Sequence, residues 1–243
     1  EPDRIFLSAD GIHDLLILQQ PTNPVPAPPG ATGLYHIALL LPNRASLADQ
    51  WLHLHAHRQW LVGASDHSVS EAIYLQDPDG NGIEIYADRV HVPVETMGTE
   101  RLQVESLLRE ATGKPWQGMP AATVMGHLHL KVRELEEAVE FYRDILGFQL
   151  MMQMGSSAAF MATGGYHHHI GLNTWESEGG PAPPINAIGL ETALLSVSDA
   201  DTLAGISKRM QAAGIEAVWR KSELIVRDPS GNTLCLKTGE GSN

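Results

Sequence analysis

Two titratable side chains lie inside apolar stretches of the sequence, where burial is unfavourable unless the side chain has a partner. His36 lies in the run YHIALLL (35–41), and Glu84 lies between two isoleucines in IEIY (83–86). Burying a carboxylate without a partner costs several kcal/mol. Glu84 therefore needs a cation, a metal ion or hydrogen-bond donors, unless its strand face is exposed. For His36 taken alone, the plainer interpretation is a hydrogen-bonded core histidine.

Both polar residues disappear together in a second copy of the same pattern. The stretch DPDGNGIEIY (77–86) recurs as DPSGNTLCLK (228–237), with Cys235 where the first copy has Glu84. In the same way Thr192 replaces His36. This joint change predicts a site that one copy keeps and the other has lost. Cys235 itself is expected to be a small buried apolar residue and not a nucleophile.

The repeat extends over most of the chain. Residues 6–18 match 160–172, residues 33–42 match 189–198, and the DP-x-GN turns match, at offsets of 154, 156 and 151. Three matches in one order at a nearly constant offset indicate a duplication. The second copy begins near Val124, so about 31 residues of the first copy have no counterpart before residue 1. The absence of an initial Met predicts that translation began upstream.

Composition excludes several classes of function. The formal net charge of −13 argues against a nucleic-acid or anionic-membrane surface, which needs clustered Lys and Arg. The single cysteine excludes an internal disulfide and a cysteine-based zinc site, and it fits a reducing, cytoplasmic location. The chain has no apolar run of about 20 residues for a membrane helix, and its first residues do not form a signal peptide. A homo-oligomer is compatible with the composition.

The periodicity predicts an α+β fold in which each copy pairs two β-α-β-β-β units, the first unit of copy one lacking its N-terminal part. In copy two, strands are expected at 126–132, 160–162, 168–172, 190–196, 223–227 and 233–237, and helices at 135–146 and 203–210. In copy one, Ser46 is predicted to cap a helix over 46–57. The predicted division is a first module (1–92), a linker (93–123) and a second module with a degenerate site (124–243).

Two histidines and one carboxylate form the facial ligand set of non-haem Fe(II) enzymes. His36 and Glu84 supply two of these ligands if a strongly curved sheet brings the first and last strands of their unit face to face. The third ligand is expected to be a histidine on the absent first strand, for which His127 is the counterpart in copy two. Residues 167–169 (HHH) and the histidines at 53, 55 and 57 are other metal candidates, but an ordinary strand and an exposed helix face are the simpler interpretations.

Several stretches carry a resemblance to a known family. The duplicated units, GLYHIALLLP (33–42), SDHSVSEAIYLQDPDGNGIEIY (65–86) and GYHHHIGL (165–172) resemble the vicinal oxygen chelate superfamily, which includes the glyoxalase and bleomycin-resistance proteins. The similarity is greatest to its two-module, catechol 2,3-dioxygenase-like branch. It covers nearly the whole chain, and the block from His67 to Glu84 is its most specific part.

The resemblance implies an Fe(II)-dependent extradiol dioxygenase, with Mn(II) as the alternative metal, that acts on a small aromatic diol and dioxygen. It implies that His36 and Glu84 are metal ligands and that His67 assists proton transfer. It also implies that Tyr74 hydrogen-bonds the ring-hydroxyl oxygen and that His13 lies on the cavity wall. Without the resemblance, His67 would be interpreted as a solvated loop histidine and Tyr74 as a core aromatic.

Two other functions remain open on the sequence. A glyoxalase-like, metal-dependent isomerase or lyase would use the same modules but usually has more carboxylates in its site, and His67 and Tyr74 count against it. A non-enzymatic member of the fold would only bind a small molecule in the cavity.

Overall fold

The computed structural model describes residues 4–239 and separates into two compact units. Of the described residues, unit 1 comprises 4–24, 35–129 and 165–169, and unit 2 comprises 25–34, 130–164 and 170–239. These units differ from the predicted division at 93–123, because residues 124–129 and 165–169 of the second copy belong to unit 1. No helix in the described part of the chain is long and apolar enough to cross a membrane.

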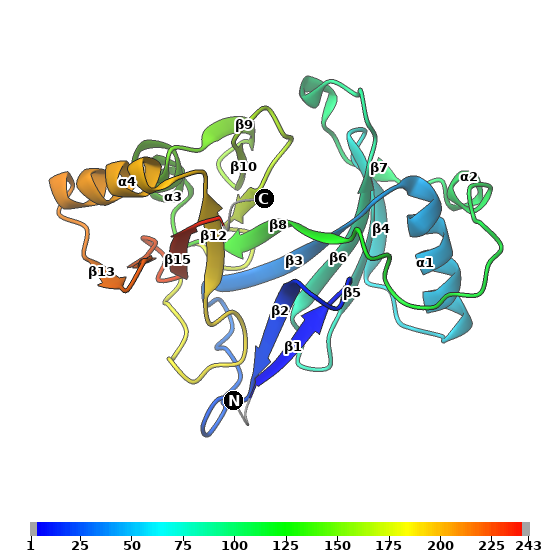
Figure 1. The fold of residues 1–243 in the computed structure, drawn as a ribbon, viewed down its shortest axis with the longest axis horizontal. Helices are drawn as coiled ribbons and strands as arrows, with labels where there is room; N and C mark the ends of the chain where they lie inside the picture. Colours follow the sequence, from blue (N-terminus) through cyan, green and yellow to red (C-terminus); the bar gives the residue numbers. More distant parts are fainter. Residues whose placement is uncertain (1–3, 240–243) are drawn as a thin grey trace. The chain divides into compact units, whose positions relative to one another are not determined.

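Unit 1 is built on a mixed sheet with the strand order β7-β4-β5-β6-β3-β8 (Figure 1). Its strands are β3 (Gly33–Leu41), β4 (Gly63–Asp66), β5 (Ser70–Gln76), β6 (Gly82–Asp88), β7 (Glu100–Arg101) and β8 (Val124–Lys131). A turn in which the Asp77 carboxylate accepts hydrogen bonds from the amides of Asp79 and Asn81 joins the antiparallel strands β5 and β6. Strand β3 then runs parallel to β6 as its hydrogen-bonded neighbour.

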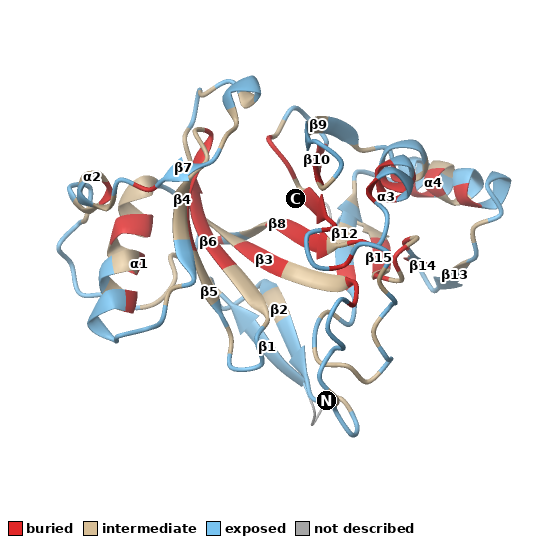
Figure 2. Ribbon diagram, turned by 180° about the vertical axis from the view of Figure 1, so that it is seen from behind, coloured by how far each residue is buried: buried red, intermediate tan, exposed pale blue. Residues whose placement is uncertain are grey.

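The two faces of this sheet have different side chains. Ile73 and Ile85 point to the face that packs against α1 (Arg44–Ala56), and their core cluster includes Leu47 of that helix and Leu107 of α2 (Val104–Leu108) (Figures 1 and 2). The alternate residues of the same strands, including Tyr86, point to the opposite face. Since α1 covers only one face, the opposite face is left for the polar side chains described below.

Three details of unit 1 differ from the sequence expectations. The helix α1 is capped by Asn43, whose side chain accepts a hydrogen bond from the Ser46 amide, so the cap lies three residues before the predicted one. The predicted linker contributes η1 (Val94–Thr96), strand β7 and helix α2 to the unit. Strands β3 and β6 are adjacent rather than face to face, because β3 forms the next ladder beside β6.

An isolated hairpin also belongs to unit 1. Strands β1 (Arg4–Ser8) and β2 (Asp14–Gln19) pair antiparallel, as the match of residues 6–18 to 160–172 predicts. Both strands are largely exposed, as the pale ribbon in Figure 2 shows.

Unit 2 contains two groups of strands. One has β9 (Gln149–Met154), β10 (Ala158–Ala162) and β11 (Ile170–Asn173), and the other has the order β12-β15-β14-β13 with β12 (Ala193–Val197), β13 (Ala217–Arg220), β14 (Glu223–Arg227) and β15 (Thr233–Thr238). Its helices are α3 (Leu135–Glu140), which continues as the π-helical segment η2 (Phe141–Leu146), and α4 (Ala200–Ala212). The α+β class is confirmed, and only β9 and β13 were absent from the expected elements of this copy.

Candidate metal centre

Three donor atoms converge on the polar face of the unit 1 sheet. Glu84 Oε2 lies 3.0 Å from His36 Nε2 and 3.2 Å from His127 Nε2, and the two imidazole nitrogens are 3.4 Å apart. The three residues come from β6, β3 and β8, and they are 3%, 6% and 3% exposed. Among residues 4–239, no other group of three His, Cys, Asp or Glu side chains has its donor atoms so close together.

The strand register brings these residues together. His36 pairs with Gly82 and Ala38 pairs with Glu84, so the two-residue period of a strand puts His36 and Glu84 on one face. The two strands approach closely at Gly82, where an added Cβ would lie 2.1 Å from the Tyr35 carbonyl oxygen and 2.9 Å from the His36 Cβ. Copy two has Thr233 at the position of Gly82. The glycine is therefore a third position that changes together with the two polar residues.

The protonation states suit a metal ligand set. Burial by itself raises the pKa of Glu84, but the charge and hydrogen bonds of His127 and His36 outweigh burial, so its pKa lies well below the usual range. Burial lowers the pKa of His127 despite the attraction of Glu84. At neutral pH the carboxylate is ionised and the His127 imidazole is neutral, which is the form in which both groups coordinate a cation.

The spacing of the donors fits a divalent metal ion. Bonds of about 2.1 Å at right angles separate two ligand atoms by about 3.0 Å, and tetrahedral angles separate them by about 3.4 Å. The measured separations of 3.0, 3.2 and 3.4 Å fall in this range. Both hydrogen-bonding contacts that the structure gives His127 are made by Nε2, on the side of the cluster. Two imidazoles and one carboxylate also match the ligand set of non-haem Fe(II).

His127 is the second histidine that lies beside His36 and Glu84. The sequence predicts it as part of the second module, as the counterpart of a ligand histidine expected before residue 1. The structure places residues 124–129 in unit 1, with β8 next to β3 in the strand order. Side chains of β6, β3 and β8 therefore meet in one three-donor group, and the histidine from before residue 1 stays a prediction.

His67 and Tyr74 form a hydrogen-bonded pair in the same unit. The Tyr74 hydroxyl lies 2.7 Å from His67 Nε2, while His67 Nδ1 lies 2.9 Å from the Gly98 carbonyl oxygen. Because a carbonyl only accepts, Nδ1 carries the proton and Nε2 accepts the Tyr74 hydroxyl. Both ring nitrogens of His67 are therefore held by hydrogen bonds, one to the Gly98 carbonyl and one to Tyr74.

Tyr74 connects this pair to the three-donor cluster. It pairs with Glu84 across the β5–β6 ladder, so both side chains lie on one face, and its ring centroid is 5.7 Å from that of His36. Burial, followed by the charge of Glu84, raises the pKa of Tyr74 well above its ordinary value. The hydroxyl therefore remains protonated at neutral pH and keeps its proton for the hydrogen bond to His67 Nε2.

His13 lies in the turn between β1 and β2. Its side chain is 80% exposed, and its Nδ1 lies 2.6 Å from Asp10 Oδ2. The role of His13 on a cavity wall stays a prediction.

The HHH stretch contributes a second polar group beside the cluster. His167 Nε2 lies 2.9 Å from Asp88 Oδ1, and the Tyr166 hydroxyl lies 2.8 Å from that of Tyr86 and 3.0 Å from Asp88 Oδ2. The His168 ring centroid is 4.1 Å from that of His127. The sequence predicts these histidines as an ordinary strand or a separate metal site, and nothing in their spacing indicates the contacts with Asp88 and His127.

Two further residues singled out in the sequence, His53 and Cys235, have packing roles in the structure. His53 of α1 stacks on Trp116 with ring centroids 3.7 Å apart. Cys235 is buried, and burial raises the pKa of its thiol, in agreement with a packing role.

Comparison with known proteins agrees with this fold and cluster. The model of the Glyoxalase/Bleomycin resistance protein/Dioxygenase superfamily matches residues 124–236. A catechol-2,3-dioxygenase from Bacillus subtilis (strain 168) is 41% identical over 232 residues, which cover 92% of this chain and 81% of that protein. A biphenyl-2,3-diol 1,2-dioxygenase from Rhodococcus globerulus is 32% identical over 83 residues, covering 34% of this chain and 44% of that protein.

A solved structure from Bacillus subtilis subsp. subtilis str. 168, named as a candidate dioxygenase, has the same fold. It covers 99% of this chain and 74% of its own, with a TM-score of 0.64 and 11% identity. The chain therefore belongs to the glyoxalase, bleomycin-resistance and dioxygenase superfamily, also called the vicinal oxygen chelate superfamily. Within it the chain stands in the catechol 2,3-dioxygenase-like branch, and it is an enzyme of the extradiol dioxygenase type.

Proposed function

We propose that this enzyme opens the ring of a catechol-type substrate beside the diol, using dioxygen and an Fe(II) ion held by His36, Glu84 and His127. The observation that carries the proposal is the buried cluster of two imidazoles and one carboxylate, with the His67–Tyr74 pair on the same unit. A facial set of three protein ligands leaves open positions, so a bound iron supplies the redox chemistry that couples an aromatic diol with dioxygen.

The residues around the cluster bind the diol and move its protons. Tyr74 is protonated and partly buried, and its hydroxyl oxygen, which donates to His67, accepts a hydrogen bond from a diol hydroxyl and fixes the ring orientation. A diol proton that reaches the Tyr74 oxygen can pass on to His67 Nε2, along the existing 2.7 Å hydrogen bond. His67 then returns the proton as a general acid. Both atoms of dioxygen enter the ring-opened product, so the overall reaction needs no external reductant.

The composition of the cluster favours ring cleavage over glyoxalase-like isomerisation. The three-donor group has one carboxylate, whereas a glyoxalase-like isomerase usually has more carboxylates in its site. The hydrogen-bonded His67–Tyr74 pair provides the proton transfer that ring opening requires.

The test is oxygen uptake by protein loaded with Fe(II) under anaerobic conditions and then mixed with catechol in aerated buffer. We expect uptake and a yellow ring-opened product. Resorcinol is the matched control, because its two hydroxyls are not adjacent and cannot both reach one metal ion. Bound iron without uptake on catechol, or equal uptake on resorcinol, would overturn the proposal.

A further inference from the structure

One arginine holds the turn that carries His67. Arg89, which directly follows β6, contacts Asp66 Oδ1 and Oδ2 with its two terminal nitrogens, both at 2.6 Å. One of those nitrogens also donates to the Ser68 carbonyl oxygen at 3.2 Å, and the Arg89 amide donates to the Val69 carbonyl oxygen at 2.7 Å. Residues on both sides of His67 are therefore hydrogen-bonded to one residue, Arg89, through its guanidinium and its backbone amide.

The turn needs such support because its backbone is strained. Ser68 has φ of +65°, a left-handed conformation that is unfavourable for a residue other than glycine. The Ser68 amide donates to Asp66 Oδ1 at 2.8 Å, and the same carboxylate accepts hydrogen bonds from Arg89. Removal of the guanidinium would free both the carboxylate and the Ser68 carbonyl, so the turn can relax.

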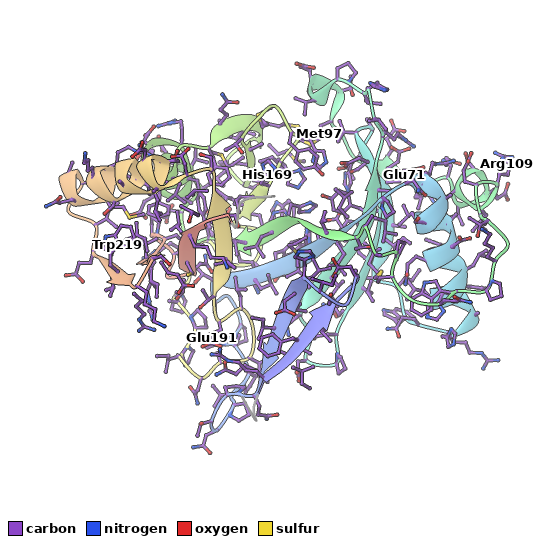
Figure 3. All side chains as sticks on the ribbon, in the orientation of Figure 1. Glu71, Met97, Arg109, His169, Glu191 and Trp219 are labelled. Atoms are coloured by element: carbon purple, nitrogen blue, oxygen red, sulfur yellow. The ribbon has the colours of Figure 1, made fainter. Side chains whose placement is uncertain are left out.

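Arg89 is itself anchored by a buried carboxylate. Glu71 is 1% exposed, and its Oε1 lies 2.9 Å from Arg89 and 3.1 Å from Arg44. Figure 3 labels Glu71, which lies near the first turn of α1, where Arg44 is located. A planar guanidinium suits the contacts of Arg89 with Asp66 and Glu71, because its N–H donors point to two carboxylates at fixed angles. The two arginines balance the charges of Glu71 and Asp66.

The orientation of His67 depends on where the turn lies. Its Nδ1 donates to the Gly98 carbonyl oxygen at 2.9 Å, and its Nε2 accepts from Tyr74 at 2.7 Å. A displacement of about 1 Å would weaken both bonds and costs about 100-fold in turnover when a catalytic group is misplaced. Arg44 shares Glu71 with Arg89, but its other hydrogen bonds go to Ser106 and Glu110, away from the His67 turn.

We infer that Arg89 is a positioning residue that holds His67 in the tautomer and orientation needed for proton transfer to and from Tyr74. The kinetic part of this inference rests on the proposed function, whereas the structural part does not. The two arginines share Glu71 but differ in role. Arg89 positions His67, whereas Arg44 belongs to the first turn of α1.

The first experiment is nitrogen-15 NMR of the histidine rings in metal-free protein, with His67 assigned from the His67→Asn variant. In the wild type we expect a proton on Nδ1 of His67. Arg89→Met should give a mixture of tautomers, whereas Arg44→Met should keep the wild-type signal. An unchanged His67 signal in folded Arg89→Met would overturn the inference. If Arg89→Met does not fold, Arg89→Lys takes its place, because it keeps the charge but loses the fork.

The second experiment measures turnover of the iron-loaded enzyme with catechol. Arg89→Met should lower kcat about 10- to 100-fold, with KM and iron affinity within about threefold of wild type, while Arg44→Met stays within about threefold in kcat. In a His67→Asn background, Arg89→Met should have no further effect on kcat, because both act through the same group. Losses that multiply in the double variant would contradict the inference. If the wild type does not turn over, the proposed function fails, and the NMR result still decides the role of Arg89.

Discussion

Glu84 brings the only negative charge of the three-donor cluster, so it determines whether a divalent cation is held. Replacing Glu84 by Gln preserves the shape of the side chain but removes the charge between two imidazoles. We expect Glu84→Gln to weaken Fe(II) affinity by more than about 100-fold. Anaerobic titration calorimetry measures this change directly.

Tyr74→Phe is the matched variant, because Tyr74 lies opposite Glu84 without being one of the three donors. It should retain iron affinity within about threefold and lose about 100-fold in kcat with the hydroxyl. Equal iron affinity in Glu84→Gln and wild type would show that the cluster is not the metal site.

At the residue scale, comparison of the two copies predicts His36 and Glu84, because each has a non-ligand at its twin position. The same comparison misplaces His127. Twin positions identify which strand a residue occupies, but the order of strands in the sheet decides which strands are neighbours. His67 and Tyr74 are each predicted only through the family motif, and the 2.7 Å contact between them is not predicted, since nothing in their spacing fixes it.

At the scale of the element, the ladder between β3 and β6 sets the position of His36. An added Cβ at Gly82 would clash with β3, and the φ of Gly82 lies outside the left-handed region, so only this clash opposes an alanine there. We expect Gly82→Ala to reduce the free energy of unfolding by about 1–3 kcal/mol and to weaken metal affinity by moving His36. Urea unfolding and metal titration test the two effects.

Gly63 provides the control for this substitution. It lies in β4 of the same sheet, and an added Cβ there meets no atom within 4 Å. Gly63→Ala should be neutral or stabilising by about 0.5–1 kcal/mol, because alanine loses less backbone freedom on folding. If both variants lose equal stability, the cause is not the close approach at Gly82.

Elements with a clear apolar period were predicted well, and exposed ones were not. Strand β14 and helix α4 have alternating or helical apolar positions, and both appear as expected. Strand β13 is mostly exposed, and its apolar residues Val218 and Trp219 are exposed too. Its sequence therefore lacks the alternation of buried apolar and exposed polar residues that predicts a strand. The helix cap moved from Ser46 to Asn43 because both residue types can cap, and only the backbone geometry chooses between them.

At the scale of the whole molecule, the candidate ligands all lie in unit 1, so metal binding should stabilise the chain unevenly. A metal ion at about 100 times its dissociation constant adds about 2.7 kcal/mol to the state that binds it. We expect hydrogen exchange under argon with Fe(II) to slow at the amides of β3, β6 and residues 124–129 of β8. Amides of α4, β13 and β14 that exchange by local opening belong to unit 2 and should be unaffected. Glu84→Gln should show no slowing in either unit. Equal protection in α4, or protection that persists in Glu84→Gln, would mean that the ion acts elsewhere than at the three-donor cluster.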